Sequence, residues 1–412
     1  MALDYALALG IQGAGQKARR KTLLIASLMA NLGILIIFKY SGFFAGLWSG
    51  VTGTGKLTLD FVLPFGISFY TFHAMSYVID VYRGTIRAER NFTYYSAYVM
   101  FFPQLVAGPI ARASHLLHQF SEPKRLRYSN FTIGSLLIAK GYFLKAVLAD
   151  HLSPMVDAFL GDSLSGSPLL TLQGIYFFAF QIYFDFSGYT HIARGVAKLF
   201  GFDLVLNFNR PYSAASITEF WRRWHISLST WLRDYLYISL GGNRYGKWRT
   251  YWNLMITMLL GGLWHGAGFN FLIWGGLHGL FLATEKAMAG NRIGDALRSL
   301  PRWIRVLATF HLVCFAWIFF RSASLQGAMQ VLGRLGAILT VPNPVRFAEI
   351  NAGSWIMVLA WMAYEWAEQR FALPARYVRV HWSLRFGLLF VAILCIDLFA
   401  QANPRAFIYF QF

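Results

Sequence analysis

The chain has 412 residues, of which 57% are hydrophobic, 18% are aromatic and only 13% are charged. A soluble domain carries about 25% charged residues, so this composition excludes an ordinary soluble protein and, with several uninterrupted apolar stretches, predicts an all-α polytopic membrane protein. The formal net charge of +19 does not indicate a nucleic acid partner, because the basic residues of a membrane protein collect in its cytoplasmic segments.

Basic residues around the apolar stretches predict which side of the membrane each end faces. Lys17, Arg19, Arg20 and Lys21 precede the first predicted crossing, residues 22–38, and place the N-terminus in the cytoplasm. Residues 1–16 are only mildly apolar, so we expect no cleavable signal peptide. Later crossings are predicted over residues 61–82, 132–150, 169–187, 308–320, 354–371 and 384–400, with residues 40–60 external, an external loop at 321–353 and the C-terminus outside.

One apolar segment, residues 94–110, does not fit a simple crossing. Pro103 and the pair Gly108-Pro109 interrupt it, and basic residues flank the region on both sides. Proline removes a backbone donor and clashes with the preceding turn, and irregular backbone is tolerated at membrane depth only inside protein or beside a cavity. We therefore predict a re-entrant or broken segment. The sequence shows neither an internal repeat nor a long linker, so residues 1–412 are expected to form one membrane domain.

His225 lies in the run Phe-Trp-Arg-Arg-Trp-His-Ile-Ser-Leu-Ser at residues 220–229. If residues 217–239 form a helix, one face carries Trp221, His225, Leu228, Leu232 and Leu236, and the other carries most of Arg222, Arg223, Arg233 and Asp234. This pattern predicts a helix in the membrane interface with His225 directed inward. A core histidine bonded to a carbonyl is the structural alternative, whereas an ionisable group at membrane depth is a candidate for function.

His265 lies in the run Gly-Gly-Leu-Trp-His-Gly-Ala-Gly at residues 261–268. Basic residues flank both ends of the apolar segment 251–285, which predicts a hairpin with cytoplasmic ends and with His265 deep in the membrane at its bend. The glycines allow close approach of helices or of an acyl chain. The alternative is a tight packing contact between helices with a buried histidine, but such a contact would require the glycines and not the imidazole. We expect residues 200–290 to form the catalytic core segment.

Two nearby imidazoles, without a serine or cysteine in a nucleophile motif, suit general-base catalysis. One ring would take a proton from a hydroxyl acceptor, and the other would orient a group or stabilise negative charge on the acyl oxygen. The Cys and His spacing does not resemble a zinc site, so no metal is expected.

Several motifs together resemble the membrane-bound O-acyltransferase family, most closely its bacterial branch of alginate O-acetylases. They are Pro-Gln-Leu-Val-Ala-Gly-Pro-Ile at 103–110, Asn-Phe-Asn-Arg-Pro-Tyr at 207–212, the run at 220–229, Trp-Leu-Arg-Asp-Tyr-Leu-Tyr at 231–237, Leu-Gly-Gly-Asn-Arg at 240–244, Gly-Gly-Leu-Trp-His-Gly at 261–266 and Trp-Gly-Gly-Leu-His-Gly at 274–279. The resemblance implies a ring of transmembrane helices with re-entrant segments around a central catalytic tunnel. It also implies a catalytic histidine at His265 and a second active-site position at His225.

The C-terminal run Phe-Ile-Tyr-Phe-Gln-Phe at 407–412 resembles a tyrosine motif of some family members or of their small partner proteins. The resemblance implies that the hydroxyl of Tyr409 carries the acyl group on the outer side. The alternative is an aromatic anchor at the membrane interface. Asp185, a carboxylate in an apolar stretch, either orients a histidine or makes a structural hydrogen bond, and His278 is a candidate for lining the cavity.

We therefore expect a multi-pass O-acetyltransferase of the bacterial cytoplasmic (inner) membrane. It would move an acetyl group from a cytoplasmic donor, acetyl-CoA, towards an extracytoplasmic polysaccharide such as alginate, or an acceptor protein. Arg222, Arg223 and Arg244 are candidate contacts to donor phosphates, although cytoplasmic arginines also occur without such a role. No tightly bound cofactor is expected, and membrane lipid is the remaining partner.

Two alternatives come from other functional classes. A transporter or flippase would use the histidines as a proton relay, but the repeats typical of many transporters are absent from the sequence. A non-catalytic scaffold of a polymer-export complex would need neither histidine for acetylation.

Overall fold

The computed structural model describes residues 1–53, 64, 66–106, 108–125, 127–161, 167–339, 350–401 and 405–408. Every regular element within these residues is a helix, which confirms the predicted all-α class. Five described helical stretches are long and apolar enough to cross a membrane: Lys17–Thr52, Tyr128–Leu160, Pro168–Leu199, Arg302–Arg321 and Trp382–Phe399.

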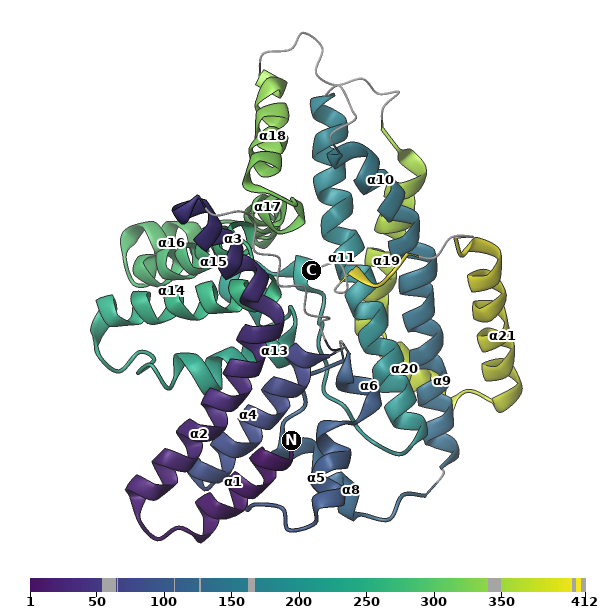
Figure 1. Cartoon of the computed structure of the whole chain (residues 1–412). Coiled ribbons are helices and arrows are strands. Elements are labelled where there is room, and N and C mark those ends of the chain that lie inside the picture. The colour runs from purple at the N-terminus through teal and green to yellow at the C-terminus, as the bar shows by residue number, and fades with distance from the viewer. Residues whose placement is uncertain are drawn as a thin grey trace.

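Helix α11 (Pro168–Leu199) runs through the larger hydrophobic core (Figure 1). Its residues from Phe177 to Phe180 are all buried, as expected for a helix that is apolar around its whole circumference. Three consecutive elements pack along it, namely α9 (Tyr128–Tyr142), the π-helix η2 (Phe143–Ala149) and α10 (Asp150–Leu160). Helices therefore cover the residues of the predicted crossings at 132–150 and 169–187, and both helical stretches are longer than predicted.

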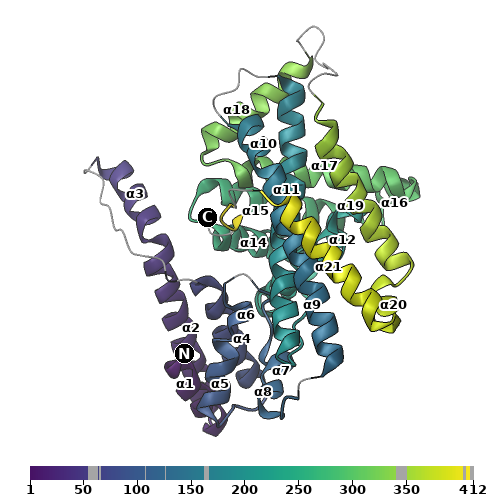
Figure 2. The ribbon, with the colours of Figure 1, turned by 90° about the vertical axis from the view of Figure 1, so that its right-hand side faces the viewer.

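The N-terminal helices pack around a second core cluster. They are α1 (Ala2–Gly13), α2 (Lys17–Leu35) and α4 (Ile67–Arg83). Asp4 of α1 accepts hydrogen bonds from Ser27 Oγ at 2.6 Å and Asn31 Nδ2 at 2.7 Å, which ties α1 to α2. The π-helix η1 (Ile36–Tyr40) and α3 (Ser41–Thr52) continue α2, so the helix does not end near residue 38 as predicted. In Figure 2, α2 and α3 lie on one side of the molecule, away from α19 and α20.

The segment 94–110 is broken, as predicted. Helix α5 (Phe92–Val99) ends before Pro103, and α6 (Phe102–Leu105) is a single short turn. The short helices α7 (Ala113–Leu116) and α8 (His118–Ser121) follow. The Gln104 side chain donates a hydrogen bond to the Tyr98 carbonyl at 2.9 Å. A side chain thus satisfies a carbonyl near the interruption, which is how irregular backbone is tolerated inside a membrane protein.

Residues 217–239 do not form one continuous helix, so that prediction is wrong. Residues 222–225 separate α12 (Ile217–Trp221) from α13 (Ile226–Trp231), and the π-helix η4 (Leu232–Tyr237) follows. The helix breaks because His225 has a left-handed backbone conformation, with φ +40° and ψ +56°. The predicted inward face is largely correct, since Trp221, His225, Leu228 and Leu232 are buried, whereas Leu236 is only partly buried.

The predicted hairpin over residues 251–285 is present as α14 (Gly246–His265) and α15 (Phe269–Met288), which pack against each other. The hairpin lies crosswise to α11 in Figure 1. His265 is the last residue of α14, at the bend. Gly262 makes the close helix contact possible, because a Cβ atom there would lie 2.2 Å from the carbonyl oxygen of Phe271.

The C-terminal third adds α16 (Arg292–Ser299), α17 (Arg302–Arg321), α18 (Leu325–Gly336), the 3-10 helix η5 (Ala337–Leu339), α19 (Ala352–Arg370), α20 (Leu373–Arg379) and α21 (Trp382–Phe399). The segment 321–353, predicted as a loop, therefore contains α18; residues 340–349 lie outside the described residues. Helix α21 is apolar and has no buried residue, so it is expected to face lipid.

Candidate active site

His225 lies at the junction between α12 and α13, and Asn207 binds the two residues that follow it. The N–H of Ile226 donates to the Asn207 carbonyl at 2.8 Å, and the N–H of Ser227 donates to Asn207 Oδ1 at 3.1 Å. A left-handed backbone costs a non-glycine residue about 1–2 kcal/mol, and the surrounding structure must stabilise it. Such strain is often found at functional sites. The Asn207 contacts explain how this histidine keeps its unusual conformation.

His265 lies where α14 ends, and the last carbonyls of that helix are bound by side chains from η1. Lys39 Nζ donates to the carbonyl of Trp264 at 2.6 Å and to that of His265 at 3.0 Å. Tyr40 Oη donates to the Leu263 carbonyl at 2.6 Å. These carbonyls have no partner inside the helix, and a cation at a helix C-terminus is favourable. Lys39 and Tyr40 therefore fix the end of the helix that carries His265.

The sequence reading missed Lys39, although a signal was present. A lysine within an otherwise apolar stretch is rare, and it marks a site with a specific partner. The predicted crossing ended at residue 38, which placed Lys39 at the membrane surface. The continuous helix from Lys17 to Thr52 instead places it within a candidate membrane span.

Aromatic rings connect His225 with His265. The ring centroid of Trp264 lies 6.3 Å from that of His225 and 4.9 Å from that of His265. His225 is completely buried and His265 is 7% exposed. Both histidines therefore contact one indole, and the structure brings together two motifs that are forty positions apart in the sequence.

His278 extends this group by one further ring. Trp274 lies 5.1 Å from His265 and 4.9 Å from His278, measured between ring centroids. His278 is completely buried, and neither of its ring nitrogens has a hydrogen-bond partner among the described residues. The three imidazoles and the two indoles form what we call the aromatic centre, defined as His225, Trp264, His265, Trp274 and His278.

The other sequence motifs converge on the same region. The N–H of Ile110, at the end of the broken segment, donates to Ser227 Oγ at 2.9 Å. The N–H of Asn209 donates to the Arg223 carbonyl at 2.9 Å, and Arg223 Nη1 donates to the Asn209 carbonyl at 3.2 Å. The segments 103–110 and 207–212 thus form hydrogen bonds with Arg223 and Ser227, on either side of His225.

The Trp-Leu-Arg-Asp-Tyr-Leu-Tyr motif carries a charge cluster at Asp234, which pairs with Arg112 and Arg233. Burial alone would raise the pKa of Asp234, but the hydrogen bonds from Arg233 and Arg112 outweigh it and hold the pKa below its ordinary value. Asp234 is therefore ionised at neutral pH and links η4 to Arg112, which follows the broken segment.

A cavity of about 830 Å³ lies between α12, α13, η4 and the α14–α15 hairpin. We call it the basic cavity, because four cationic side chains line it against one carboxylate, Glu285: Arg222, Arg233, Lys286 and Arg298. Trp221 also lines it, and the Trp221 ring lies 5.0 Å from His278 and 5.8 Å from Trp274 between centroids. The basic cavity is therefore next to the aromatic centre.

The three arginines predicted as donor contacts lie in different surroundings. Only Arg222 lines the basic cavity. Arg223 pairs with Glu219 at 2.8 Å, and Arg244 binds the carbonyls of Gly241 and Ile238 within its own turn. Arg233, Lys286 and Arg298 were not singled out from the sequence, because only the fold brings these residues of η4, α15 and α16 to one cavity.

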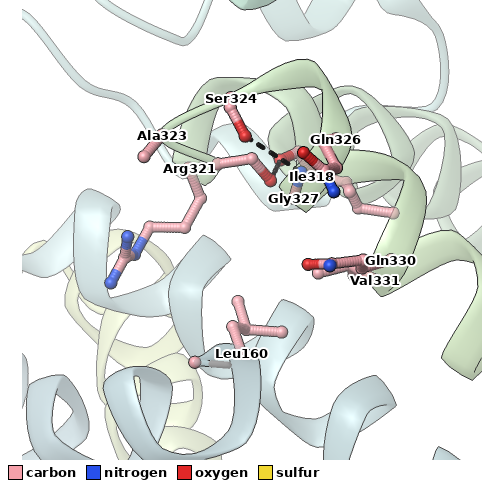
Figure 3. A pocket seen from close by; sticks show the side chains of 11 residues that line it. Leu160, Ile318, Arg321, Ala323, Ser324, Gln326, Gly327, Gln330 and Val331 are labelled. Carbon is pink, nitrogen blue, oxygen red and sulfur yellow. Dashed lines mark hydrogen bonds between the residues drawn. The ribbon is translucent and has the colours of Figure 1, made fainter. Parts of the chain in front are cut away.

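A second, polar hollow of about 380 Å³ lies at the end of α17 and the start of α18 (Figure 3). Ser322, Ser324, Gln326 and Gln330 line it with hydroxyl and amide groups. Arg321 borders this polar hollow, and its guanidinium pairs with Asp157 at 2.7 Å. In Figure 3 the Arg321 guanidinium points away from the two glutamines.

Asp185 does not orient a histidine in the structure. Its Oδ1 pairs with Lys145 at 2.8 Å, and its Oδ2 accepts a hydrogen bond from the N–H of Ile408 at 2.7 Å. The structural alternative considered for this residue is therefore correct. Tyr409, the next predicted site residue, lies outside the described residues.

Comparison with known proteins adds a family match. A sequence model of the membrane-bound O-acyltransferase family matches residues 83–325, which include His225 and His265. The chain is 39% identical over 388 residues to a probable alginate O-acetylase, AlgI, of Pseudomonas aeruginosa, covering 90% of this chain and 72% of that relative.

Two further relatives carry names with other acceptors or acyl groups. A peptidoglycan O-acetyltransferase of Helicobacter pylori is 36% identical over 355 residues, covering 80% of this chain and 67% of the relative. A teichoic acid D-alanyltransferase of Streptococcus thermophilus is 30% identical over 295 residues, covering 66% of this chain and 70% of the relative.

Proposed function

Because this chain belongs to the membrane-bound O-acyltransferase family and is a multi-pass membrane acyltransferase, we propose that it moves an acetyl group from cytoplasmic acetyl-CoA to an extracytoplasmic polysaccharide such as alginate. The observation that carries this proposal is the position of His265, buried at the bend of the α14–α15 hairpin and connected with the basic cavity through the rings of Trp274 and Trp221. We propose that the protein lies in the cytoplasmic (inner) membrane of a bacterium, since the names of its relatives give alginate, peptidoglycan and teichoic acid as the polymers that they modify.

The basic cavity is the proposed donor site. Its charge suits the phosphates of acetyl-CoA, and guanidinium groups bind phosphate through paired hydrogen bonds. Arg222 and Arg233 would hold this end of the donor. Since clusters of basic residues favour the cytoplasmic side, this cavity opens to the cytoplasm in our proposal. The thioester would then enter towards Trp221 and the aromatic centre.

His265 is the proposed general base. Its imidazole takes the proton of an acceptor hydroxyl, and the hydroxyl oxygen attacks the thioester carbonyl to form a tetrahedral intermediate. Collapse of this intermediate breaks the carbon–sulfur bond, and the CoA thiolate receives a proton as it leaves. His225, in its neutral form, would donate a hydrogen bond to the developing oxyanion, where charge stabilisation has a large effect on rate. The low exposure of both rings keeps water away from the donor.

The acceptor would approach from the opposite side of the membrane. The polar hollow beside Arg321 offers amide and hydroxyl groups that suit a hydroxyl-rich polymer. Asp157 pairs with both Arg321 and Arg405, so this hollow is linked to the C-terminal segment. In our proposal the phenol of Tyr409 receives the acetyl group first and passes it to the polymer or to an acceptor protein. A phenol needs a base to act as a nucleophile, which is a role for the histidine pair.

The direct test uses inverted membrane vesicles, which expose the cytoplasmic face, supplied with acetyl-labelled CoA. We expect label in polymer or acceptor protein with the natural chain, and a loss with His265→Ala at equal protein level. His381→Ala is the control, because this exposed histidine at the start of α21 is remote from the aromatic centre in sequence and makes only local contacts with Ser383 and Trp382. Undiminished transfer by His265→Ala would contradict the enzymatic proposal.

A further inference from the structure

A buried charge cluster lies beside the aromatic centre and is not used by the chemistry proposed above. Lys145 Nζ pairs with Asp150 at 2.8 Å and with Asp185 at 2.8 Å, and it donates a hydrogen bond to the Arg405 carbonyl at 2.9 Å. Both carboxylates are almost completely buried, with side-chain exposures of 3%. The cluster joins η2, α10 and α11 with the C-terminal segment 405–408.

The C-terminal segment supplies groups that this cluster needs. A buried charge must be paired and hydrogen-bonded, or its desolvation is strongly unfavourable. Lys145 uses the Arg405 carbonyl as its third acceptor, and Asp185 uses the Ile408 N–H as the donor to its second oxygen. Without residues 405–408, one ammonium proton and one carboxylate oxygen would lose these partners. The cluster is therefore matched to a bound C-terminal segment.

The same segment packs beside His225. The Phe407 ring lies 4.8 Å from the ring of Tyr189 and 6.0 Å from that of Phe186, measured between centroids. The ring of Phe186, which follows Asp185 in α11, lies 4.7 Å from the imidazole of His225. Phe407 and Ile408 are only 6% and 4% exposed. One aromatic ring thus separates the anchored segment from a proposed active-site histidine.

We propose that Lys145, Asp150 and Asp185 form a clamp that holds residues 405–408 against α11 and so positions the C-terminal end of the chain for acyl transfer. These three are positioning residues, because they act through the backbone of Arg405 and Ile408. The catalytic part of this proposal rests on the proposed function, in which Tyr409 receives the acetyl group. The anchoring part depends only on the contacts described above.

The anchoring part is tested by thiol labelling. Cys314 and Cys395 are changed to alanine, and Ile408→Cys places a single thiol at a buried position while keeping the backbone N–H. In membranes, N-ethylmaleimide should modify this thiol slowly. Asp185→Leu removes both the charge and the acceptor, and should raise the labelling rate about tenfold by opening the segment locally. Asp185→Asn keeps an acceptor oxygen for the N–H and should give a smaller increase.

The positioning part is tested by kinetics in inverted vesicles with acetyl-labelled CoA, using the chain with Ile408 intact. Asp185→Leu should lower turnover about tenfold or more, because misplacement of a reacting group by about 1 Å is enough for such a loss. The acetyl-CoA concentration that gives half-maximal rate should not change, since Asp185 does not line the basic cavity. Asp185→Asn should restore part of the turnover.

Lys140→Met is the matched control. Lys140 also lies in the helical stretch Tyr128–Leu160 and pairs with Glu368 at 2.6 Å, but it does not contact residues 405–408. It should change neither labelling nor turnover.

Three results would overturn the clamp: rapid labelling of Ile408→Cys in the chain that lacks Cys314 and Cys395 but keeps Asp185, unchanged labelling after Asp185→Leu, or faster labelling with unchanged turnover. Failure of both Asp185 variants to accumulate in membranes would show a requirement for folding, which also overturns a positioning role. Labelling does not depend on acyl transfer, so a failure of the proposed function would be seen separately, as transfer by His265→Ala.

Discussion

The ammonium group of Lys39 donates a hydrogen bond to the main-chain carbonyl of His265 at 3.0 Å, across 226 positions of sequence. It also binds the Trp264 carbonyl and lies 5.8 Å from the centroid of the Trp264 ring. A residue of the first long helix therefore determines how the α14 helix ends, and with it the position of the proposed general base.

Lys39→Met should strongly impair acetyl transfer while leaving the chain in the membrane. It removes the cation from two helix-terminal carbonyls, and loss of a hydrogen bond to a charged group costs about 1.5–3 kcal/mol. We expect transfer to fall about tenfold or more, measured in inverted vesicles at equal protein level. Lys21→Met in the same helix is the control, since Lys21 is exposed. Equal activity of both variants would refute the role assigned to Lys39.

His265→Ala should lower turnover about 10²- to 10⁴-fold, the usual contribution of general acid–base catalysis, and His225→Ala about 10²- to 10³-fold, the usual contribution of an oxyanion donor. His278→Asn should have a smaller effect, because the Trp274 ring separates His278 from His265 and His278 contributes packing to the aromatic centre. Single-turnover transfer from acetyl-labelled CoA measures these differences. If His278→Asn were as inactive as His265→Ala, the assignment of the base would have to change.

His225→Gly should separate stability from activity. Glycine adopts the left-handed conformation without the penalty that alanine meets, so His225→Gly should be more stable than His225→Ala by about 1 kcal/mol. Both variants should be equally inactive, because both lack the imidazole. Thermal unfolding in detergent measures the first quantity and acetyl transfer the second. Lower stability of the glycine variant would show that the backbone at residue 225 is not strained.

Gly262→Ala should disrupt the hairpin, whereas Gly276→Ala should be tolerated. A Cβ atom at Gly262 would lie 2.2 Å from the Phe271 carbonyl oxygen, but one at Gly276 would lie 3.6 Å from the nearest atom, a Leu259 methyl carbon. Overpacking of this kind costs about 1–3 kcal/mol or more. The amount of folded protein after extraction in mild detergent should fall for Gly262→Ala only. Equal yields would mean that α14 and α15 can separate without loss.

Arg222→Gln should weaken donor binding more than Arg244→Gln. Arg222 lines the basic cavity, whereas Arg244 binds carbonyls of its own turn. The acetyl-CoA concentration that gives half-maximal rate should rise about tenfold for Arg222→Gln, equivalent to about 1.4 kcal/mol of binding free energy. It should change about twofold or less for Arg244→Gln, and salt should reduce the difference. A larger effect at Arg244 would move the donor site away from this cavity.

Local patterns in the sequence determined much of the architecture. The apolar composition and the flanking charges predicted a helical membrane protein, and the prolines of residues 94–110 predicted the break that the structure shows. The basic residues at both ends of segment 251–285 predicted the hairpin with His265 at its bend, and the glycines predicted close helix contact. These features could be read from the sequence because helix formation, helix interruption and helix-packing glycines depend on residues that are close together in the chain.

The helix prediction over residues 217–239 was wrong, and the sequence left the partner of Asp185 undecided, for one shared physical reason. Residues 217–239 have the periodicity of one helix, but the contacts of Asn207 with Ile226 and Ser227 favour a break at His225. Asp185 was considered as a partner for a histidine, yet Lys145 and Ile408 occupy both of its oxygens. In each case a residue distant in sequence supplies the hydrogen bond, so periodicity and local composition contain no signal for it.

The sequence by itself determined the class of the protein, the two histidines and the motifs around them, because each is recognisable from neighbouring residues. Only the tertiary structure decided that Trp264 lies between those histidines, that Lys39 fixes the end of α14, and that cations from η4, α15 and α16 share one cavity with Arg222. Helix packing and buried charge pairing make these contacts, and both depend on which distant surfaces meet in the folded chain.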